Sequence, residues 1–294
     1  MDISILIVNY NTKELILNCL QSIYEHTKDI DFEVIVIDNN SHDGSIDAIK
    51  NYFKNVNIIN SGSNLGFGGA NNLGCDYARS DYLFFLNSDT LLIENSIKFL
   101  LDKYKELEKN NRIGTLGAIL VDEKGNITTS GGKVPTVWQF ISMHFMKIVP
   151  KNIKKANQDY IKSQLSKVEM VSGADMVIKK ELFKELNGFD ENFFLYYEDT
   201  DLHKRLLDLG YINYLDCTTR IMHYEGGSAE MSHWKRTVIH TSQNYFFRKH
   251  STLFLFIVYS IYQLLFSIFS LLNGKYTFKQ NIDFIKTNLK NFKL

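Results

Sequence analysis

Three acidic side chains lie within four residues of one another in the segment YYEDTDL, which spans residues 196–202. They are Glu198, Asp199 and Asp201, and a leucine-rich pattern typical of a helix follows them. Carboxylates this close repel one another, and each raises the pKa of its neighbours. Three arrangements would offset the repulsion: the start of a helix, a bound metal ion, or a reaction that uses one carboxylate as a base.

Other polar residues follow apolar runs that are typical of buried strands. Asp38 ends the run VIVID, Asp89 follows YLFFLNS, and His223 ends a third run. A carboxylate at the carboxyl end of a strand is placed to bind a ribose or a base. Asp89 with His223 is compatible with a Mg²⁺ or Mn²⁺ site that bridges to a diphosphate. A turn carboxylate and a structural histidine are the alternative interpretation.

A glycine-rich segment, NLGFGGANNLG, spans residues 64–74 and interrupts a helical pattern. Glycine permits positive φ and close approach of a backbone, and a helix that starts after it would favour phosphate. The spacing matches neither the dinucleotide fingerprint nor a P-loop, and the sequence has no GK[ST] motif. These differences argue against hydride transfer and P-loop hydrolysis.

The elements that must position these residues are predicted most clearly up to about residue 115. Apolar runs typical of buried strands span residues 3–10, 32–39, 55–60 and 82–89. Helical patterns separate them, so we expect right-handed βαβ units and a mostly parallel sheet with helices on both faces. Such sheets bind ligands at the carboxyl ends of their strands, where the polar motifs fall.

The remainder of the chain has a different character. Residues 113–132 predict a strand, a turn and a second strand, and residues 168–183 predict a strand that enters a helix. Residues 199–210 predict a helix that ends at its final glycine. Residues 140–167 are basic and show no clear period.

A 21-residue apolar segment, residues 252–272, contains Gln263 as its one strongly polar residue. It is long enough to span a bilayer, but basic residues flank both of its ends and indicate no orientation. A buried core helix, an interfacial helix and a membrane span are the three interpretations. From Arg248 onward the chain has seven Lys/Arg residues against Asp283, which favours an anionic surface as partner.

The composition limits the class of protein. The 294 residues are 45% hydrophobic with zero formal net charge, which is enough for a sizeable core and too apolar for disorder. We expect no nucleic-acid partner. The three cysteines have no metal-site or disulfide spacing, and the N-terminus lacks the pattern of a signal peptide. A reducing cytoplasm is therefore the expected compartment.

Taken in order along the chain, the motifs VNYN, VIDNNSHDGS, NLGFGGANNLG, FLNSD, EDTDL and H…GGS resemble those of the family 2 glycosyltransferases with the GT-A fold. The resemblance covers roughly residues 1–230. Within the family it is closest to rhamnosyltransferase-like members, whose metal motif often begins with asparagine, as NSD does here. The implied fold is α/β, with a Rossmann-like, mostly parallel central sheet, helices on both faces and a C-terminal helical extension.

The resemblance implies how a nucleotide-sugar would be held. Asn9, Asn11 and Asp38 would hold its nucleobase and ribose, and Asn64 and Gly66 would line the nucleotide pocket. Each of these residues stands in a motif quoted above.

The resemblance also implies a metal site for Mg²⁺ or Mn²⁺. Asp89 takes the position of the second aspartate of the family's DxD motif, and His223 that of a further ligand. Asn87 departs from the pattern, because many members have aspartate there. An amide binds a divalent ion less strongly, so we expect residue 87 to contribute little to the affinity.

For the acidic segment, the resemblance aligns Asp199 with the catalytic base, and Glu198 is the alternative. Negative charge in the first helical turn is favoured by roughly 0.3–1 kcal/mol per residue. That explains Asp201 as a helix-start residue, but it does not explain three acids together.

The predicted function is an inverting, metal-dependent glycosyltransferase. The donor is predicted to be dTDP-rhamnose or a UDP-hexose, and the acceptor a lipid-linked saccharide of a surface polysaccharide. The enzyme would lie in the cytoplasm, on the inner face of the membrane. A polyprenyl-phosphate sugar synthase and a non-catalytic nucleotide-binding protein are the alternatives.

Three functional regions are expected. Residues 1–115 would form the nucleotide-sugar-binding half of the GT-A domain, and residues 116–245 the acceptor-binding and catalytic half. Residues 246–294 would form a basic, apolar, helical tail that associates with membranes.

Overall fold

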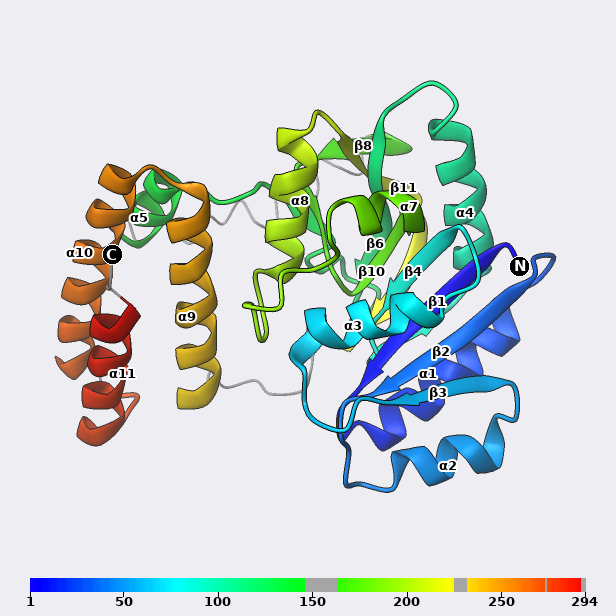
Figure 1. Ribbon diagram of the computed structural model, residues 1–294, viewed down its shortest axis with the longest axis horizontal. Coiled ribbons are helices and arrows are strands. Elements are labelled where there is room, and N and C mark those ends of the chain that lie inside the picture. The colour runs from blue at the N-terminus through cyan, green and yellow to red at the C-terminus, as the bar shows by residue number, and fades with distance from the viewer. Residues whose placement is uncertain (146–162, 225–231, 273, 292–294) are drawn as a thin grey trace. The chain divides into compact units, whose positions relative to one another are not determined.

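The computed structural model describes residues 1–145, 163–224, 232–272 and 274–291; they are drawn as ribbon in Figure 1. The chain divides into two units. The first comprises Met1–Val134, Lys154–Glu191 and Glu198–Gly227, and the second comprises Pro135–Ile153, Asn192–Tyr197 and Ser228–Leu294. The predicted functional regions, with boundaries after residues 115 and 245, stay predictions.

The first unit is organised around a mixed sheet. Among the described residues, nine strands form this sheet, with the order β3-β2-β1-β4-β10-β6-β11-β5 and with β8 paired to β11. Their bounds are β1 Ile3–Asn9, β2 Phe32–Asp38, β3 Val56–Asn60, β4 Tyr82–Leu86, β5 Thr90–Leu92, β6 Ile113–Val121, β8 Leu165–Val168, β10 Asp175–Lys179 and β11 Ile212–His223. The four strands predicted up to residue 115 are thus confirmed.

Most of the central pairs are parallel. Strands β3, β2, β1 and β4 run in one direction, and β11 runs parallel to β6. Strand β10 is antiparallel to both of its neighbours, β4 and β6. In the register of β1 and β2, Asn9 lies opposite Asp38, so the ends of these two strands meet. The predicted mostly parallel sheet is confirmed.

Helices cover both faces of this sheet (Figure 1). Their bounds are α1 Lys13–His26, α2 Ser45–Tyr52, α3 Gly66–Tyr77, α4 Ser96–Leu107, α7 Lys180–Glu185 and α8 Glu198–Asp208. Side chains of α1, α2 and α4 pack with Ile5 and Ile7 in one core, and side chains of α3, α7 and α8 pack with Leu6 in the other. Alternate residues of β1 therefore contribute to opposite cores, as the two-residue period of a strand requires.

The glycine-rich segment is itself helical. Residues 64–74 were expected to interrupt a helix, but α3 runs through them because its glycines permit close packing. A Cβ at Gly74 would lie 2.6 Å from Ile37 Cδ1, and one at Gly68 would lie 2.9 Å from Phe189 Cβ. Gly66, at the start of α3, has a φ of 74°, which favours glycine.

The predictions for residues 113–210 are largely confirmed. Strand β6 forms and a turn follows it, but the second strand is reduced to a bridge between Val121 and Ile127 and the two-residue β7, Gly131–Gly132, which pairs with β9, Met170–Val171. Helix α7 follows β10 directly, and α8 ends before Gly210, whose φ is 78°. Most of the basic segment 140–167 lies outside the described residues.

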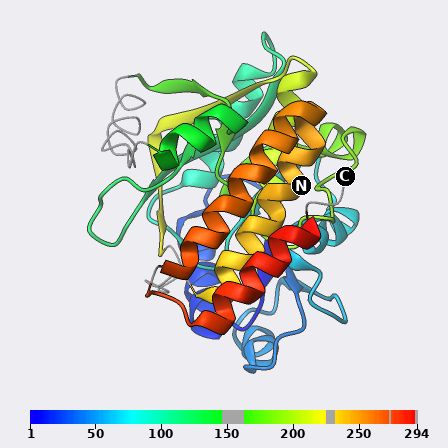
Figure 2. The same ribbon diagram turned by 90° about the vertical axis from the view of Figure 1, so that its left-hand side faces the viewer.

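The second unit is helical. It contains α5 (Val137–Phe145), α9 (His233–His250), α10 (Leu253–Phe269), the 3₁₀ turn η1 (Ser270–Leu272) and α11 (Phe278–Asn291). Helices α9, α10 and α11 lie side by side, as Figure 2 shows. Between α9 and α10, the rings of Phe247 and Tyr259 lie 4.6 Å apart, and Gln263 donates to Gln243 at 3.2 Å. The predicted C-terminal helical extension is confirmed.

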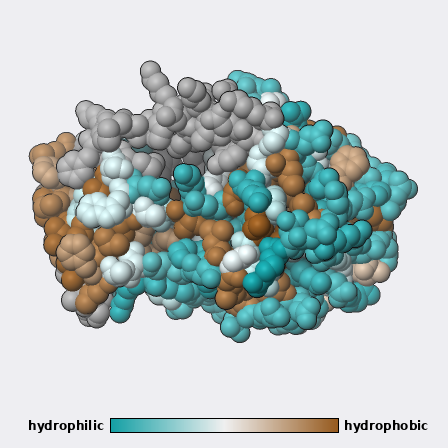
Figure 3. Space-filling model, turned by 90° about the horizontal axis from the view of Figure 1, so that it is seen from above, coloured by the Kyte–Doolittle hydropathy of each residue, from teal (hydrophilic) through white to brown (hydrophobic). Residues whose placement is uncertain are grey.

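Helix α10 leaves much of its apolar surface uncovered. With η1 it forms a 20-residue apolar segment, Leu253–Leu272, of which 28% is buried; its length and composition would allow it to cross a membrane. Figure 3 shows apolar side chains gathered over the helical second unit. The large apolar side chains of this segment that are at least 45% exposed are Leu253, Phe254, Ile261, Leu265, Ile268, Phe269 and Leu272.

Candidate active site

Asn9 and Asp38 form a buried polar cluster where β1 and β2 end. Asn9 is fully buried and Asp38 is 3% exposed. The side-chain nitrogen of Asn9 lies 3.2 Å from Asp38 Oδ1, 3.0 Å from Ser41 Oγ and 2.8 Å from Ser45 Oγ. The backbone N–H of Ser41 donates to Asp38 Oδ2 at 3.3 Å. The Asn9 amide is therefore engaged within the protein, and it fixes the Asp38 carboxylate.

Asn39 organises the next part of the site and was not predicted from the sequence. Its side-chain nitrogen donates to Asn64 Oδ1 at 2.9 Å and to the carbonyl of Gly66 at 3.0 Å. Asn64 Oδ1 in turn accepts the N–H of Gly66 at 3.0 Å. Asn11 is exposed, with a φ of 53°, and its side chain accepts the N–H of His42 at 2.8 Å. Of these residues, Asn11 is the most accessible to a ligand.

Thr12 connects this cluster to the loop after β4. Its hydroxyl lies 2.9 Å from Asn9 Oδ1 and 3.1 Å from Ser88 Oγ. In the same loop, Asn87 donates its backbone N–H to the carbonyl of Ala174 at 2.9 Å, and its own carbonyl accepts the Thr90 hydroxyl at 2.7 Å. The backbone on either side of Asp89 is thus held in place.

Asp89 and His223 are brought together by the sheet. Strand β5 follows Asp89 directly and pairs antiparallel with β11, with Thr90 opposite His223. As a result, Asp89 Oδ1 lies 3.2 Å from His223 Nε2, and the side chains are 18% and 12% exposed. His223 Nδ1 is buried without a hydrogen-bond partner among the described residues.

This pair fits a small divalent site that a ligand completes. Among the described residues no group of three His, Cys, Asp or Glu side chains could hold a metal ion. Mg²⁺ commonly binds one or two protein carboxylates together with substrate phosphates and water. Asp89 supplies one such carboxylate, and His223 Nε2 lies 3.2 Å from it.

Asp199 lies in the first turn of α8, and its carboxylate is half-buried. Oδ2 accepts the backbone N–H of Gly173 at 3.1 Å, and Oδ1 accepts the N–H of Thr200 at 2.6 Å. Ala174, which follows Gly173, accepts the backbone N–H of Asn87. Hydrogen bonds therefore connect Asp199 with the loop that carries Asp89.

His203, which was also not predicted, anchors the turn that carries Asp199. The N–H of Val171 donates to His203 Nε2 at 3.2 Å, so this nitrogen is the acceptor and the proton lies on Nδ1. Nδ1 then donates to the backbone carbonyl of Asp199 at 2.7 Å. Burial lowers the pKa of His203 and keeps the ring neutral. A lone histidine in a leucine-rich helix gave no sequence signal for this role.

Glu198 differs sharply from Asp199. It is 5% exposed, and its Oε2 has no hydrogen-bond partner among the described residues. Burial, and secondarily the charge of Asp199, raise the pKa of Glu198 well above its usual value. The neutral acid is therefore favoured at Glu198.

Asp201 has a structural role. It is fully buried, and its carboxylate pairs with Arg205 Nε at 2.8 Å, one turn further along α8. Arg205 also donates to the carbonyls of Leu186 at 2.6 Å and Gly188 at 2.8 Å. The expected position of Asp201 in the first turn of the helix is confirmed.

The two tyrosines before the acids have strained backbones. Tyr196 and Tyr197 have φ values of 67° and 71°, which are uncommon for bulky residues. Within the second unit, Gln243 Nε2 donates to the Tyr197 hydroxyl at 2.5 Å, and the Tyr197 ring lies 5.5 Å from that of Phe246. Strained positions of this kind concentrate at functional sites.

Comparison with known families identifies two matching models. The model of glycosyl transferase family 2 matches residues 4–186, and that of the N-terminal domain of galactosyltransferase matches residues 155–226. Asn9, Asp38, Asn64, Gly66 and Asp89 all fall within the first match.

Curated relatives include two rhamnosyltransferases. The N-acetylglucosaminyl-diphospho-decaprenol L-rhamnosyltransferase of Mycobacterium tuberculosis is 26% identical over 229 residues, which cover 73% of each chain. Rhamnosyltransferase WbbL of Escherichia coli is 28% identical over 209 residues, which cover 69% of this chain and 75% of WbbL.

Two solved structures resemble the fold. Staphylococcus aureus TarS (residues 1–349) has a TM-score of 0.52 at 14% identity, and the mannosyltransferase PcManGT of Pyrobaculum calidifontis, in complex with GDP-Man and Mn²⁺, has a TM-score of 0.58 at 16% identity. Each match covers 99% of this chain, and 71% and 73% of those chains respectively. The predicted GT-A fold is confirmed.

Proposed function

The chain belongs to glycosyl transferase family 2 and is a glycosyltransferase, and from this premise we propose that it transfers a sugar from a nucleotide-sugar to a saccharide acceptor in the synthesis of a cell-surface polysaccharide. The single observation that carries the proposal is the set of hydrogen bonds joining three groups. These groups are the Asp38 cluster, the loop with Asp89 and the Asp199 carboxylate. Together these groups would recognise the nucleotide, neutralise charge on its diphosphate and supply a base for the acceptor hydroxyl.

In this proposal the nucleotide is bound where β1 and β2 end. Asp38 accepts hydrogen bonds from the ribose or the base, since its carboxylate is held in a fixed orientation by Asn9 and Ser41. Asn9 is buried, so its contribution is to position Asp38. Asn11, Asn64 and Gly66 line the remainder of the nucleotide pocket.

Asp89 and His223 are the proposed ligands of Mg²⁺ or Mn²⁺. A divalent ion bound there would neutralise charge on the nucleoside diphosphate as it leaves. The side chains are preassembled, because the pairing of β5 with β11 places them 3.2 Å apart. Asn87 acts through its backbone, which fixes the loop, and contributes little direct affinity for the ion.

Asp199 is the proposed base. Its half-buried carboxylate accepts the proton of the acceptor hydroxyl, whose oxygen then attacks the anomeric carbon and displaces the nucleoside diphosphate. One displacement inverts the configuration at that carbon. Glu198 is the weaker candidate, because a carboxyl that favours its neutral form does not readily accept a proton. Strain at Tyr196 and Tyr197 supports a functional role for the same segment.

The donor and the acceptor are proposed from the relatives. Two of them are rhamnosyltransferases, and the name of one specifies a diphospho-decaprenol acceptor. We therefore assign dTDP-rhamnose as donor, with a UDP-hexose as the alternative, and a lipid-linked saccharide as acceptor. The exposed apolar face of α10 and the basic C-terminal segment support peripheral attachment to the inner face of the membrane.

A donor screen tests the function. The full chain is incubated with dTDP-rhamnose, UDP-glucose or GDP-mannose, and with Mn²⁺ or with EDTA. The acceptor is either a synthetic lipid-diphosphate-linked N-acetylglucosamine or a bare polyprenyl phosphate. We expect transfer from dTDP-rhamnose that requires Mn²⁺ and yields the inverted anomer. Donor binding without transfer to any acceptor would favour a non-catalytic protein. Transfer to the bare polyprenyl phosphate would favour a polyprenyl-phosphate sugar synthase.

A further inference from the structure

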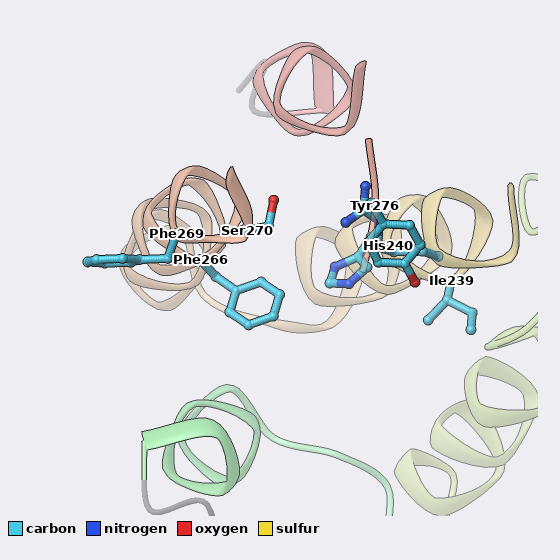
Figure 4. A pocket seen from close by; sticks show the side chains of 7 residues that line it. Ile239, His240, Phe266, Phe269, Ser270 and Tyr276 are labelled. Atoms are coloured by element: carbon cyan, nitrogen blue, oxygen red, sulfur yellow. The ribbon is translucent and has the colours of Figure 1, made fainter. Parts of the chain in front are cut away.

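The second unit contains a pocket with apolar walls between helices α9 and α10. Its volume is about 290 Å³. Figure 4 shows Phe266, from α10, directed across the gap toward His240, from α9, with Tyr276 beside it. Ser270 and the 66% exposed Phe269 also contribute to the lining. The walls suit an apolar or aromatic group.

Arg236 of α9, a cationic side chain that is 7% exposed, contributes to the lining of the pocket. Nη1 donates to Asn281 Oδ1 at 3.1 Å, and Nη2 donates to His233 Nδ1 at 3.2 Å and to the carbonyl of Gln280 at 3.3 Å. Burial, and then the charge of Arg236, lower the pKa of His233, so that its ring is neutral and can accept. Every hydrogen-bond partner of the guanidinium among the described residues is therefore uncharged.

The guanidinium retains unused donors. Arginine has five N–H groups, and the three bonds to described residues leave the Nε–H and one Nη1–H without an acceptor. Nε is buried without a partner in the described part of the chain. Arg236 forms no ion pair within 4.0 Å with a carboxylate of the described residues, and Asp283 of α11, which acts electrostatically on the neighbouring His233, is exposed. Within the described residues, the guanidinium thus lacks a full set of acceptors and a carboxylate in direct contact.

Two aromatic rings partly compensate for the missing counter-ion. The guanidinium carbon of Arg236 lies 3.8 Å from the centre of the Tyr276 ring and 4.1 Å from that of Phe284. Such cation–π contacts stabilise a buried cation and hold the guanidinium plane in one orientation. They leave the Nε–H and one Nη1–H of the guanidinium without an acceptor, and charged N–H donors of this kind bind phosphate.

We propose that this pocket binds the phosphate group of an amphipathic lipid, with Arg236 as the phosphate ligand and the aromatic walls against the first carbons of the chain. A buried arginine that lacks some of its hydrogen-bond acceptors is stabilised by a bound anion. The apolar lining of the pocket favours an anion that carries a hydrocarbon chain.

The surface beside the pocket can accept the remainder of such a chain. The cavity lies at the lower end of the range of ligand pockets, so it holds only a head group and the start of a chain. Phe269, Ile268 and Leu272, at the end of α10 and in η1, are 66%, 45% and 85% exposed. They continue the apolar lining outward, as expected for a site that faces lipid.

Identifying the lipid as the isoprenoid phosphate carrier of the acceptor rests on the proposed function. The binding itself does not, because it needs neither donor nor catalysis. An ordinary anionic phospholipid offers the same chemistry, a phosphate ester on an apolar chain. The experiment therefore includes both lipids as separate probes.

The test is a calorimetric titration of the full chain with farnesyl phosphate, kept below its micellar concentration. Farnesol, inorganic phosphate and dioctanoyl phosphatidylglycerol are titrated in parallel. We expect farnesyl phosphate to bind most tightly. Arg236→Met should weaken its binding roughly 10- to 100-fold, as expected for charge-assisted hydrogen bonds, and should leave the weaker binding of farnesol unchanged.

Two further variants keep the test decisive if Arg236→Met does not fold. Ile239→Trp fills the pocket from the α9 wall while Arg236 remains, so it should abolish binding without lowering the melting temperature. Arg248→Met removes an exposed arginine of the same helix outside the pocket and should change nothing.

Three results would overturn the proposal. One is equal binding of farnesol and farnesyl phosphate, and another is unchanged binding of farnesyl phosphate by Ile239→Trp. The third is tighter binding of dioctanoyl phosphatidylglycerol, which would refute the isoprenoid assignment. If farnesyl phosphate binds through Arg236 in a chain that transfers no sugar, the proposed function fails and the lipid site stands.

Discussion

Asp199 and Gly173 are joined by a hydrogen bond of 3.1 Å from the backbone N–H of Gly173 to the Asp199 carboxylate. The next residue, Ala174, accepts the backbone N–H of Asn87. One dipeptide thus contacts the proposed base on one side and the proposed metal-binding loop on the other. The first contact uses the Asp199 side chain and the second uses only backbone atoms. Substitution of the Asn87 side chain therefore leaves the connection intact, whereas substitution at Asp199 must keep an oxygen that accepts the Gly173 N–H.

Asp199→Asn should lower kcat by about 10²–10⁴, the usual contribution of a positioned base. The amide retains an oxygen that can accept the Gly173 N–H, but it cannot take a proton from the acceptor. Donor affinity should change little, which binding of dTDP-rhamnose in the absence of acceptor measures. The matched control is Glu198→Gln, which should stay active. If Glu198→Gln is inactive and Asp199→Asn is active, the base is Glu198.

Glu198→Gln should stabilise the protein at neutral pH. The pKa of Glu198 is raised in the folded state by burial, so the folded state binds its proton more tightly than the unfolded state does. Wild-type stability therefore falls as pH rises above the unfolded value, near 4.5, whereas the glutamine variant has no such loss. The two melting temperatures should converge near pH 4 and separate toward pH 7.

The control for that measurement is Glu185→Gln, which removes an exposed carboxylate from α7. Its melting temperature should follow that of the wild type over the same pH range. A constant offset between Glu198→Gln and the wild type from pH 4 to pH 8 would mean that Glu198 ionises equally well in both states.

The sequence predicted the first strands well because they are buried on both faces. Residues 3–10 and 32–39 are near-continuous runs of Ile, Val and Leu or Phe, and β1 and β2 end within one residue of those limits. The sheet order was not predictable in the same way. Strand β10 pairs with β4 and β6, which are distant in sequence, and no local pattern specifies that pairing.

The same distinction, between local sequence patterns and contacts made only in the folded chain, applies to the site residues. Asp38, Asp89 and His223 stand out in the sequence because they end apolar runs, and Asp199 because it stands in a cluster of acids. Their specific roles were implied by the resemblance and stay predictions. Asn39 stands in the same motif as Asp38, but only the folded backbone shows that it bonds Asn64 and Gly66.

The distinction between Glu198 and Asp199 also required the structure. These neighbours differ in burial because α8 begins at Glu198 and directs successive side chains to different surroundings. The spacing of the acids in YYEDTDL does not show that Glu198 is buried and Asp199 is accessible.

Asp89→Ala should abolish the Mn²⁺-dependent part of nucleoside diphosphate binding, and His223→Ala should weaken it. Both residues are proposed ligands 3.2 Å apart, and removal of either leaves a single side chain to hold the ion. Calorimetry with dTDP, in Mn²⁺ and in EDTA, measures the difference. Asn87→Ala is the control and should retain metal dependence, because the backbone of residue 87 holds the loop. Unchanged metal dependence in Asp89→Ala would exclude that residue as a ligand.

The membrane prediction is best tested by substitution rather than by removal of residues 252–294. Phe247 of α9 is 1% exposed and packs on Tyr259 of α10. A truncated chain would therefore expose core residues of α9 and aggregate whether or not α10 contacts lipid. Substitutions on the exposed face of α10 avoid this effect.

The triple variant Phe254→Ser, Ile261→Ser, Leu265→Ser should bind anionic vesicles at least ~100-fold more weakly than the wild type. These side chains are 69%, 51% and 50% exposed, and burying each in lipid would contribute roughly 1.5–3 kcal/mol. Vesicle co-sedimentation measures the loss, and an unchanged melting temperature shows that the fold is kept. The control, Tyr52→Ser, removes an exposed aromatic ring from α2 and should bind like the wild type. A wild type that stays monomeric without detergent and does not sediment with vesicles would refute membrane attachment, because the exposed face of α10 would then have no affinity for lipid.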